Sequence, residues 1–278
     1  LILLRISGYG QTGPYKDRPG FARIAHAFGG LTYLSGIRGE TPVTPGSTSL
    51  GDYMTGMNGC IGIMMALHHR EKTGKGQVID CALFESVFRI LDEIAPRYSF
   101  DGFVREPEGT GTLNACPHGH FPCKDDKFIA IACTTDKMFE RLTSAMRRPD
   151  LLEKFGSQSN RLANREIVLS EVEKWTLSFS RNELIKICTD SDVPAGAINS
   201  ISDIFHDPHF KERQVMTNIH VPDLGDITVP NVIPGLSDSP GSVDSLGPDL
   251  GQDNNSIYNQ ELGLSEEDLK ELKNIGVI

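Results

Sequence analysis

The sequence predicts an α/β protein with a domain boundary after about residue 100. Over residues 1–100, short apolar runs typical of buried strands alternate with helical segments, which is the pattern of an α/β domain. A Gly-, Glu- and Thr-rich stretch at about 101–113 is then typical of a linker. The chain of 278 residues has room for one large domain or two of ordinary size.

The first part opens on Leu1–Ile6, an apolar run typical of a buried parallel strand. Because no methionine precedes this strand, we expect the chain to be a fragment that lacks an upstream segment. The further elements expected here are a short helix, a strand, a long central helix, a second strand and a helix, at 21–28, 31–35, 52–73, 77–82 and 83–98.

The central helix is the most informative segment. It follows a loop of small residues and stops at Thr73-Gly74, where glycine is a common C-cap. Asp52 is placed to be its N-cap, because the carboxylate can accept a hydrogen bond from a free N–H group of the first turn. One apolar face repeats at about one-turn spacing and is expected to be buried, through Met57, Ile61, Met65 and His68.

Asp52 has two interpretations. Capping is the common role of aspartate before an apolar run. A carboxylate here could also act as a nucleophile, because Gly51 leaves room for a bulky acyl group and the helix start offers N–H donors and a positive partial charge. Those donors would keep the carboxylate ionised and could stabilise an oxyanion, and aspartate is an accepted covalent catalyst. The segment alone leaves both roles open.

A G-x-G-x-x-G motif at residues 8–13 follows the first strand, so a dinucleotide site has to be considered. That fingerprint needs a helix at the third glycine and an acidic residue about 20 positions further on. Here residues 14–19 indicate an irregular loop, and the first acid beyond Asp17 is Glu40. We therefore favour a loop that packs closely over a cleft. A nicotinamide-dependent dehydrogenase, which would bind NAD, remains the alternative for this motif.

Beyond the linker, the polar residues Lys124–Lys127 suit the turn of a β-hairpin. Several helices follow, and Ser180 with Glu183 forms a capping box for one of them. The elements expected in this part are helices at 136–147, 161–178 and 181–190, strands at 215–221 and 227–232, and an amphipathic helix that opens at 265–268.

Composition excludes several classes of partner. The formal net charge of −10 disfavours nucleic acid and membrane surfaces, and no apolar run is long enough to span a bilayer. The six sparse cysteines suit reduced thiols in a cytosol-like compartment better than a disulfide framework. Cys116, His118, His120 and Cys123 suggest zinc, but the spacing lacks a paired C-x-x-C form, so we expect no metal site.

Several segments carry a family resemblance in a fixed order over essentially the whole chain. They are I-S-G-Y-G-Q-T-G-P-Y (6–15), P-G-F-A-R-I-A-H-A-F-G-G (19–30), L-G-D-Y-M-T-G-M (50–57), A-L-H-H-R-E-K-T-G-K-G-Q (66–77), V-P-A-G-A-I-N (193–199), D-P-H-F (207–210) and the L-G…L-G-L-S-E-E-D-L…G-V-I ending (250–278). Together they resemble the class III CoA-transferases, a family that includes formyl-CoA transferase, carnitine CoA-transferase and α-methylacyl-CoA racemase.

The resemblance implies a large Rossmann-like α/β domain with a smaller α+β domain inserted in it, and two subunits that interlock as a dimer. The large domain would comprise residues 1–100 and 205–278, and the inserted domain residues 101–204. The family's N-terminal portion, which begins the sheet and carries much of the CoA nucleotide contact, is missing. We therefore expect this fragment to be inactive alone.

The family's catalytic aspartate lies in an L-G-D-x-x-T-G motif that matches Asp52. The resemblance implies that this carboxylate attacks an acyl-CoA, passes through a mixed anhydride and an aspartyl-CoA thioester, and delivers CoA to a small carboxylic acid. Coenzyme A would be a substrate and carrier, with no permanently bound cofactor. The expected compartment is the cytoplasm, or the mitochondrial matrix in a eukaryote, and the expected oligomer is a homodimer.

The same resemblance suggests residues that line the pocket for CoA and the substrate. They are Pro19, Gly20, Phe21 and Ala22, then Gly8, Tyr9 and Gly10, and finally His118 and Gly119. The last two lie in the segment 116–120, which matches a glycine-rich lid of formyl-CoA transferase but keeps one glycine. That departure puts the oxalate and formate substrates in doubt and allows a different acid.

Two other functions fit the sequence less well. The racemases have a catalytic histidine where this chain has Phe21, which cannot move a proton, and His26 lies five residues on, on another face of the short helix. Racemisation is therefore disfavoured. A catalytically incomplete fragment that acts as a binding or subunit partner need not keep Asp52, so the retained motif favours the transferase.

Overall fold

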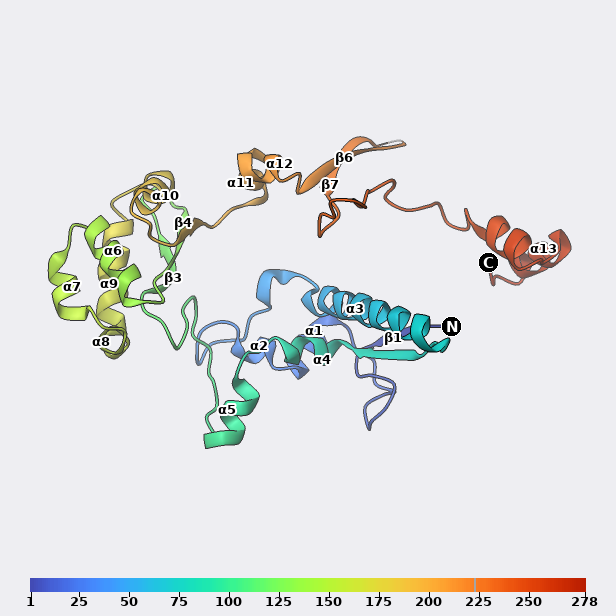
Figure 1. Cartoon of the computed structure of the whole chain (residues 1–278), viewed down its shortest axis with the longest axis horizontal. Helices are drawn as coiled ribbons and strands as arrows, with labels where there is room; N and C mark the ends of the chain where they lie inside the picture. Colours follow the sequence, from blue (N-terminus) through green and yellow to red (C-terminus); the bar gives the residue numbers. More distant parts are fainter. Residues whose placement is uncertain (223) are drawn as a thin grey trace. The chain divides into compact units, whose positions relative to one another are not determined.

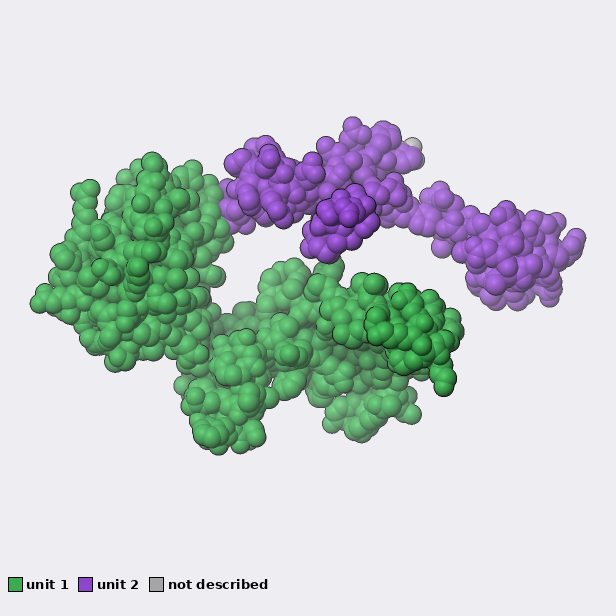
Figure 2. Space-filling view, viewed as in Figure 1, with its two compact units in different colours: residues 1–198 green, residues 199–278 purple. Residues whose placement is uncertain are grey.

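The computed structural model describes residues 1–222 and 224–278. These residues form two compact units, residues 1–198 and residues 199–278 (Figure 2). The first unit contains two separate apolar cores. One is a small cluster around Ala25, Leu83 and Val87, and the other is a larger cluster within residues 116–193. The site discussed below lies on elements of the first unit.

The first part of this unit is α/β, as predicted. Its elements are β1 (Leu3–Ser7), α1 (Ala22–Phe28), α2 (Leu31–Leu34), the 3-10 turn η1 (Pro45–Ser47), α3 (Leu50–Thr73), β2 (Val78–Ala82), α4 (Leu83–Arg89) and α5 (Ile94–Asp101) (Figure 1). The two strands pair in parallel, with Leu3 opposite Val78 and Ser7 opposite Ala82. Residues 8–21 form a loop and no helix opens on Gly13, which agrees with the expectation against a dinucleotide fingerprint.

The strand pair is less buried than predicted. Leu3 and Ile6 are 46% and 48% exposed, and Val78 is 62% exposed. The sheet of β1 and β2 has only these two strands among the described residues, and Leu3, Ile6 and Val78 are only partly covered. An apolar run predicts a strand that is buried on both faces only when layers cover both faces.

Helix α3 packs onto the two strands through its smallest residues. Its buried positions are Gly51, Thr55, Gly59 and Ala66. A Cβ atom on Gly59 would lie 2.8 Å from Leu4 Cδ2, and one on Gly62 would lie 3.1 Å from Ile79 Cγ2. The absence of side chains at these positions therefore brings the helix backbone close to β1 and β2.

The large apolar side chains of α3 lie on a different face, so the predicted buried face is wrong. Met57, Ile61 and Met65 are 60%, 54% and 67% exposed, and His68 is exposed as well. The periodicity argument assigns burial to the largest apolar residues. Here the glycines decide which face meets the sheet, because only that face permits the observed approach.

Two local predictions in this part are also wrong. Residues 31–34 form helix α2 and not a strand, and this helix follows Gly30 in a left-handed conformation with φ 96°. The single helix expected over 83–98 is divided into α4 and α5. Asp92 lies between them with φ 52°, and a positive φ cannot continue a right-handed helix.

The second part of the first unit is α+β. Its elements are β3 (His118–Pro122), β4 (Phe128–Ala132), α6 (Asp136–Ala145), α7 (Pro149–Phe155), α8 (Gln158–Ala163), α9 (Arg165–Thr176), α10 (Arg181–Asp190) and β5 (Ala195–Ala197). The three strands form an antiparallel sheet in the order β3-β4-β5. The predicted hairpin is confirmed, and so is the capping box of Ser180 and Glu183 at the start of α10.

The larger core joins this sheet to the helices. Ile129 and Ile131 of β4 are fully or almost fully buried against Phe139 and Leu142 of α6 and Leu184 of α10. Trp175, the only tryptophan, packs against this core, and its ring centroid lies 6.1 Å from that of Phe179. Its fluorescence therefore reports on this core and not on the small cluster.

The second unit consists of short elements. They are α11 (Ile201–His206), α12 (Pro208–Glu212), β6 (Met216–Val221), β7 (Gly225–Pro230), the π-helical turn η2 (Asn255–Glu261) and α13 (Glu266–Asn274). The predicted strand pair and final helix are confirmed, and Ser265 caps α13 together with Asp268. None of the described residues of 199–278 is buried, so this unit has no apolar core of its own.

The close approach of α3 to the sheet can be tested with two glycines of the same helix. Gly59→Leu places a side chain against Leu4 and should destabilise the protein by about 1–3 kcal/mol. Gly56→Leu is the matched control, because nothing lies within 4 Å of its Cβ position and leucine is the better helix former. Thermal unfolding followed by circular dichroism would measure both. An equal loss of thermal stability in the two variants would contradict this packing of α3 against β1.

Candidate active site

Asp52 lies in the first turn of α3, but it is not the N-cap. Helix α3 begins at Leu50 and its N-cap residue is Ser49, so the predicted capping role is wrong. The Asp52 side chain is exposed. Within residues 1–222 and 224–278, no hydrogen bond or ion pair engages its carboxylate. The carboxylate is therefore free to meet a ligand, at the helix end whose partial charge favours an anion.

The first-turn N–H groups are less available than the sequence suggests. Asp52 N and Tyr53 N donate to Ser49 O at 3.0 and 3.2 Å. Gly51 N donates to Nε2 of His26 at 2.9 Å. These three groups are occupied, so they are not the oxyanion donors that the sequence argument expected.

His26 is a residue that the sequence analysis considered and set aside. It belongs to α1, only 1% of it is exposed, and its ring reaches the residue directly before Asp52. A histidine flanked by two alanines in the A-R-I-A-H-A-F segment was the available signal. The local pattern could not show that α1 and α3 lie against each other.

The loop that carries most of the predicted pocket residues is held closely. A Cβ atom on Gly8 would lie 2.8 Å from Gly20 Cα, and one on Gly20 would lie 3.3 Å from Cε2 of Tyr9. The structure thus brings Gly8, Tyr9 and Gly20 together. Gly10 is buried and its N–H donates to Ser7 Oγ at 3.0 Å.

Aromatic packing fixes this loop against the helices. The Tyr9 ring lies 5.2 Å from Phe28 and 5.9 Å from Tyr15, measured between centroids, and Phe28 lies 5.1 Å from Phe84. Of the remaining predicted residues, Ala22 is buried, whereas Phe21 is 77% exposed and Pro19 is exposed. Phe21 therefore presents its ring on the surface at the start of α1.

His118 and Gly119 lie in the other part of the unit, at the start of β3. They line a cavity of about 210 Å³ that is also lined by Thr110, Arg165 and Glu173. Segment 116–120 is not a free loop, because residues 118–120 pair with β4 and Pro117 O accepts the Cys133 N–H at 2.9 Å. Among the described residues, no hydrogen bond, ion pair or ring contact joins His118 or Gly119 to the loop at 8–22.

A buried arginine holds this segment in place. Arg161 is 0% exposed, and its Nε donates to Cys116 O at 2.6 Å. Its other four N–H groups have partners in Phe155 O, Gly156 O, Asp136 Oδ1 and Gln158 Oε1. All five guanidinium donors are therefore satisfied, which is the condition for burying this charge.

Comparison with known proteins identifies the family. A family model described as CoA-transferase family III matches residues 1–254. The chain belongs to this family. The α subunit of succinyl-CoA–L-malate CoA-transferase from Chloroflexus aurantiacus is 52% identical over 280 residues, covering 100% of this chain and 65% of that protein. The β subunit of that enzyme, from the same species, is 50% identical, covering 100% and 70%.

The fold of family III is present as well. A solved CaiB/BaiF family protein from Brucella suis superposes with a TM-score of 0.79 at 31% identity, covering 94% of this chain and 68% of that one. The α/β fold class predicted from the sequence is confirmed. The chain spans about 65% of the length of the α-subunit relative.

The cysteines in the larger core of this chain are not reactive thiols. Burial raises the pKa of Cys133 to about 12 and that of Cys188 to about 11. Burial is also the main cause of the raised pKa of Cys116 and Cys123. No three His, Cys, Asp or Glu side chains gather as a metal site in the described part of the chain.

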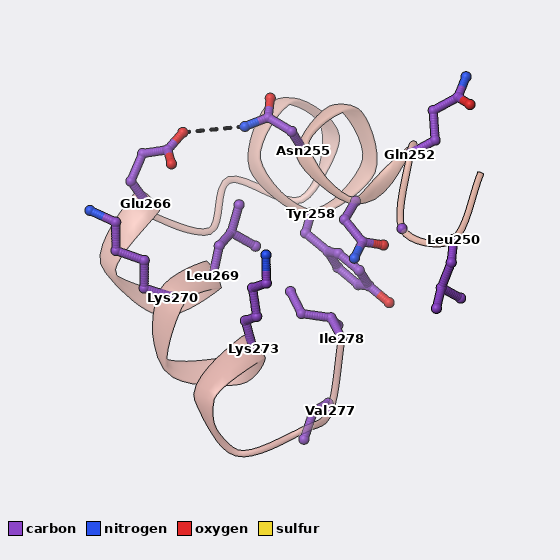
Figure 3. A pocket seen from close by; sticks show the side chains of 12 residues that line it. Leu250, Gln252, Asn255, Tyr258, Glu266, Leu269, Lys270, Lys273, Val277 and Ile278 are labelled. Atoms are coloured by element: carbon purple, nitrogen blue, oxygen red, sulfur yellow. Dashed lines mark hydrogen bonds between the residues drawn. The ribbon is translucent and has the colours of Figure 1, made fainter. Parts of the chain in front are cut away.

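A larger pocket of about 660 Å³ lies in the second unit, lined only by residues from 250 to 278 (Figure 3). Its wall combines Tyr258 and Leu269 with Lys270 and Lys273, and Asn255 donates to Glu266 across its rim at 3.2 Å. It contains none of the predicted site residues.

None of the helices in the described ranges has the length and apolar character needed to cross a lipid bilayer.

The structural role of Arg161 can be tested against a second arginine. Arg161→Met leaves four carbonyl or carboxylate groups and one amide oxygen without their donor and should cost about 3–5 kcal/mol of unfolding free energy. Arg148→Met removes a more exposed ion pair with Asp150 and Glu171 and should cost about 1 kcal/mol or less. Urea unfolding followed by Trp175 fluorescence would measure both losses. A larger loss from the Arg148 variant would contradict the assignment.

The buried thiols should resist alkylation. At pH 8 a thiol with a pKa of about 12 is almost entirely protonated, and the thiolate is the reactive form. We expect iodoacetamide to modify the exposed Cys60 while Cys133 and Cys188 stay unmodified until urea unfolds the chain. Peptide mass spectrometry would locate the label. Rapid labelling of Cys133 in the folded protein would contradict its burial.

Proposed function

We propose that this chain carries the nucleophilic carboxylate of a CoA-transferase, and that Asp52 is that group. One observation carries the proposal. The aspartate of the family's L-G-D-x-x-T-G motif is exposed at the start of a 24-residue helix, and no described group neutralises or covers its carboxylate. An exposed carboxylate that has no hydrogen-bond or ion-pair partner can attack an activated acyl carbon.

The proposed reaction proceeds by acyl exchange at Asp52. A carboxylate oxygen attacks the thioester carbonyl of the donor acyl-CoA, the C–S bond breaks, and CoA leaves as a thiolate. The resulting mixed anhydride is attacked by the thiolate at the Asp52 carbonyl, which forms an aspartyl-CoA thioester and releases the donor acid as its carboxylate. The acceptor carboxylate then attacks the carbonyl of this thioester, the C–S bond breaks, and a second mixed anhydride forms as CoA leaves again as a thiolate. The thiolate attacks the acceptor's acyl carbon in this anhydride and breaks its bond to the Asp52 oxygen. CoA leaves on the acceptor and the Asp52 carboxylate is regenerated.

Each step places negative charge on a carbonyl oxygen, so hydrogen-bond donors are needed there. The N–H groups of Gly51, Asp52 and Tyr53 are already engaged. We infer that the donors come from groups outside the first turn of α3. The loop with Gly8, Tyr9 and Gly20, and the segment with His118 and Gly119, are the candidates that the family resemblance supplies.

For the substrates, we propose succinyl-CoA or a similar dicarboxylic acyl-CoA as donor and a small dicarboxylic acid such as L-malate as acceptor. The support is the name of the relatives that are 52% and 50% identical to this chain. This class replaces the formyl-CoA and carnitine type that the sequence analysis took from the resemblance. Coenzyme A then acts as the carried group, with no permanently bound cofactor.

For the assembly, we infer that the chain works beside a second family-III chain, either a copy of itself or a related subunit. Both an α and a β subunit of one relative resemble this chain to a similar degree. We further propose that residues 1–100 and 205–278 belong to one large domain and residues 101–204 to an inserted one. The two separate cores of the first unit support this division.

Racemisation is the weaker alternative. Phe21 occupies the position of the racemase histidine and has no proton to transfer. His26 is buried and its Nε2 accepts the Gly51 N–H. It is therefore not placed to transfer a proton in place of the racemase histidine. A purely non-catalytic subunit would bind CoA weakly or not at all, and CoA binding separates it from the transferase.

Covalent trapping tests the nucleophile. The protein, expressed from its complete gene, is incubated with succinyl-CoA and then treated with hydroxylamine or borohydride, and the modified peptide is mapped by mass spectrometry. We expect the modification on Asp52, and we expect Asp52→Asn to lower kcat by about 10⁴-fold or more. Glu71→Gln, which changes another exposed carboxylate of α3, is the control and should keep normal turnover. Turnover that survives Asp52→Asn would exclude the proposed role.

A further inference from the structure

The first turn of α3 lacks the usual side-chain cap. Ser49 occupies the N-cap position with φ −84° and ψ 54°, and its hydroxyl accepts no hydrogen bond from the helix. The N–H groups at a helix start need acceptors from elsewhere, because they have no partner inside the helix. Here Nε2 of His26, on a different helix, accepts the Gly51 N–H at 2.9 Å. His26 thus supplies from α1 the acceptor that a capping side chain would supply locally.

Gly51 is held at both of its backbone polar groups by buried side chains. His26 binds its N–H, and the Thr55 hydroxyl donates to its carbonyl at 2.7 Å. His26 and Thr55 are 1% and 0% exposed. The residue that directly precedes Asp52 is therefore fixed from two sides, whereas the Asp52 carboxylate has no hydrogen bond or ion pair among the described residues. The backbone at Gly51 therefore fixes the point from which the Asp52 side chain projects.

The histidine is not explained by packing alone. Because Nε2 accepts a hydrogen bond, the ring proton must lie on Nδ1. Nδ1 is buried and has no hydrogen-bond partner among the described residues. An unpaired buried donor is unfavourable, so a leucine of similar volume would fill the site without this cost. What the imidazole adds over leucine is the acceptor for Gly51.

We propose that His26 is a positioning residue, which orients Asp52 for attack on the acyl-CoA by holding the Gly51 N–H. The inference rests on the proposed nucleophilic role of Asp52. Small displacements of a reacting group lower the rate of the chemical step, while ground-state binding of the substrate is affected far less. The expected signature of losing His26 is therefore a fall in kcat with little change in KM.

The test compares two substitutions in the protein expressed from its complete gene. His26→Leu keeps the volume and removes the acceptor, and should lower kcat by about 10- to 100-fold with KM for succinyl-CoA changed by about twofold or less. His26→Gln keeps an acceptor oxygen and should restore kcat to within about threefold of the parent. A His26→Leu enzyme with normal kcat, or a change confined to KM, would overturn the inference.

A spectroscopic measurement keeps the inference testable even if His26→Leu fails to fold. NMR of the protein labelled with ¹⁵N-histidine should show the His26 ring with its proton on Nδ1 and an unprotonated, hydrogen-bonded Nε2. A proton on Nε2 would overturn the proposed contact. The two proposals fail separately, because normal turnover of Asp52→Asn refutes the nucleophile, whereas acylation of Asp52 together with normal turnover of His26→Leu refutes only the positioning role.

Discussion

The proposed site depends on how closely the backbone of α3 approaches its neighbours. Gly51, Gly59 and Gly62 carry no side chain where the helix meets His26, Leu4 and Ile79. Larger residues at these positions would move the helix outward, and the Gly51 N–H would lose His26 as its acceptor. The same small-residue face turns the large apolar side chains of the helix outward. Packing of the helix and placement of Asp52 thus have one common cause, which is the absence of side chains along one stripe of α3.

The larger core depends on a different feature, which is a buried charge whose hydrogen-bond donors are all satisfied. Arg161 connects α6, the end of α7, α8 and the segment that enters β3, and its guanidinium carbon lies 4.6 Å from the centroid of the Phe139 ring. A guanidinium can satisfy five acceptors in one plane, which no other side chain can do. His118 and Gly119 lie two and three residues after Cys116, whose carbonyl Arg161 binds. Their position in the cavity beside Arg165 is therefore set from inside the core.

Sequence reasoning succeeded where the determining contacts are local. The hairpin turn at Lys124–Lys127 and the capping box of Ser180 and Glu183 involve residues three positions apart, and the structure confirms them. It failed where distant segments decide the outcome. The buried face of α3 depends on strands β1 and β2, and the contact between His26 and Gly51 joins residues 25 positions apart. The burial of Arg161 also depends on distant residues, because Cys116 O and Asp136 Oδ1 lie 45 and 25 positions away from it.

Residues 199–278 form helices and a strand pair without burying any described residue. Ordering a backbone costs about 1–2 kcal/mol per residue, and apolar burial, the usual compensation, is missing inside this segment. Capping boxes at Ser200 and Ser265 recover only about 1 kcal/mol each. Burial inside residues 199–278 therefore does not compensate for the cost of ordering them. A protease would measure this balance directly, because the rate of limited digestion reports how readily the segment opens, with no need for a substrate.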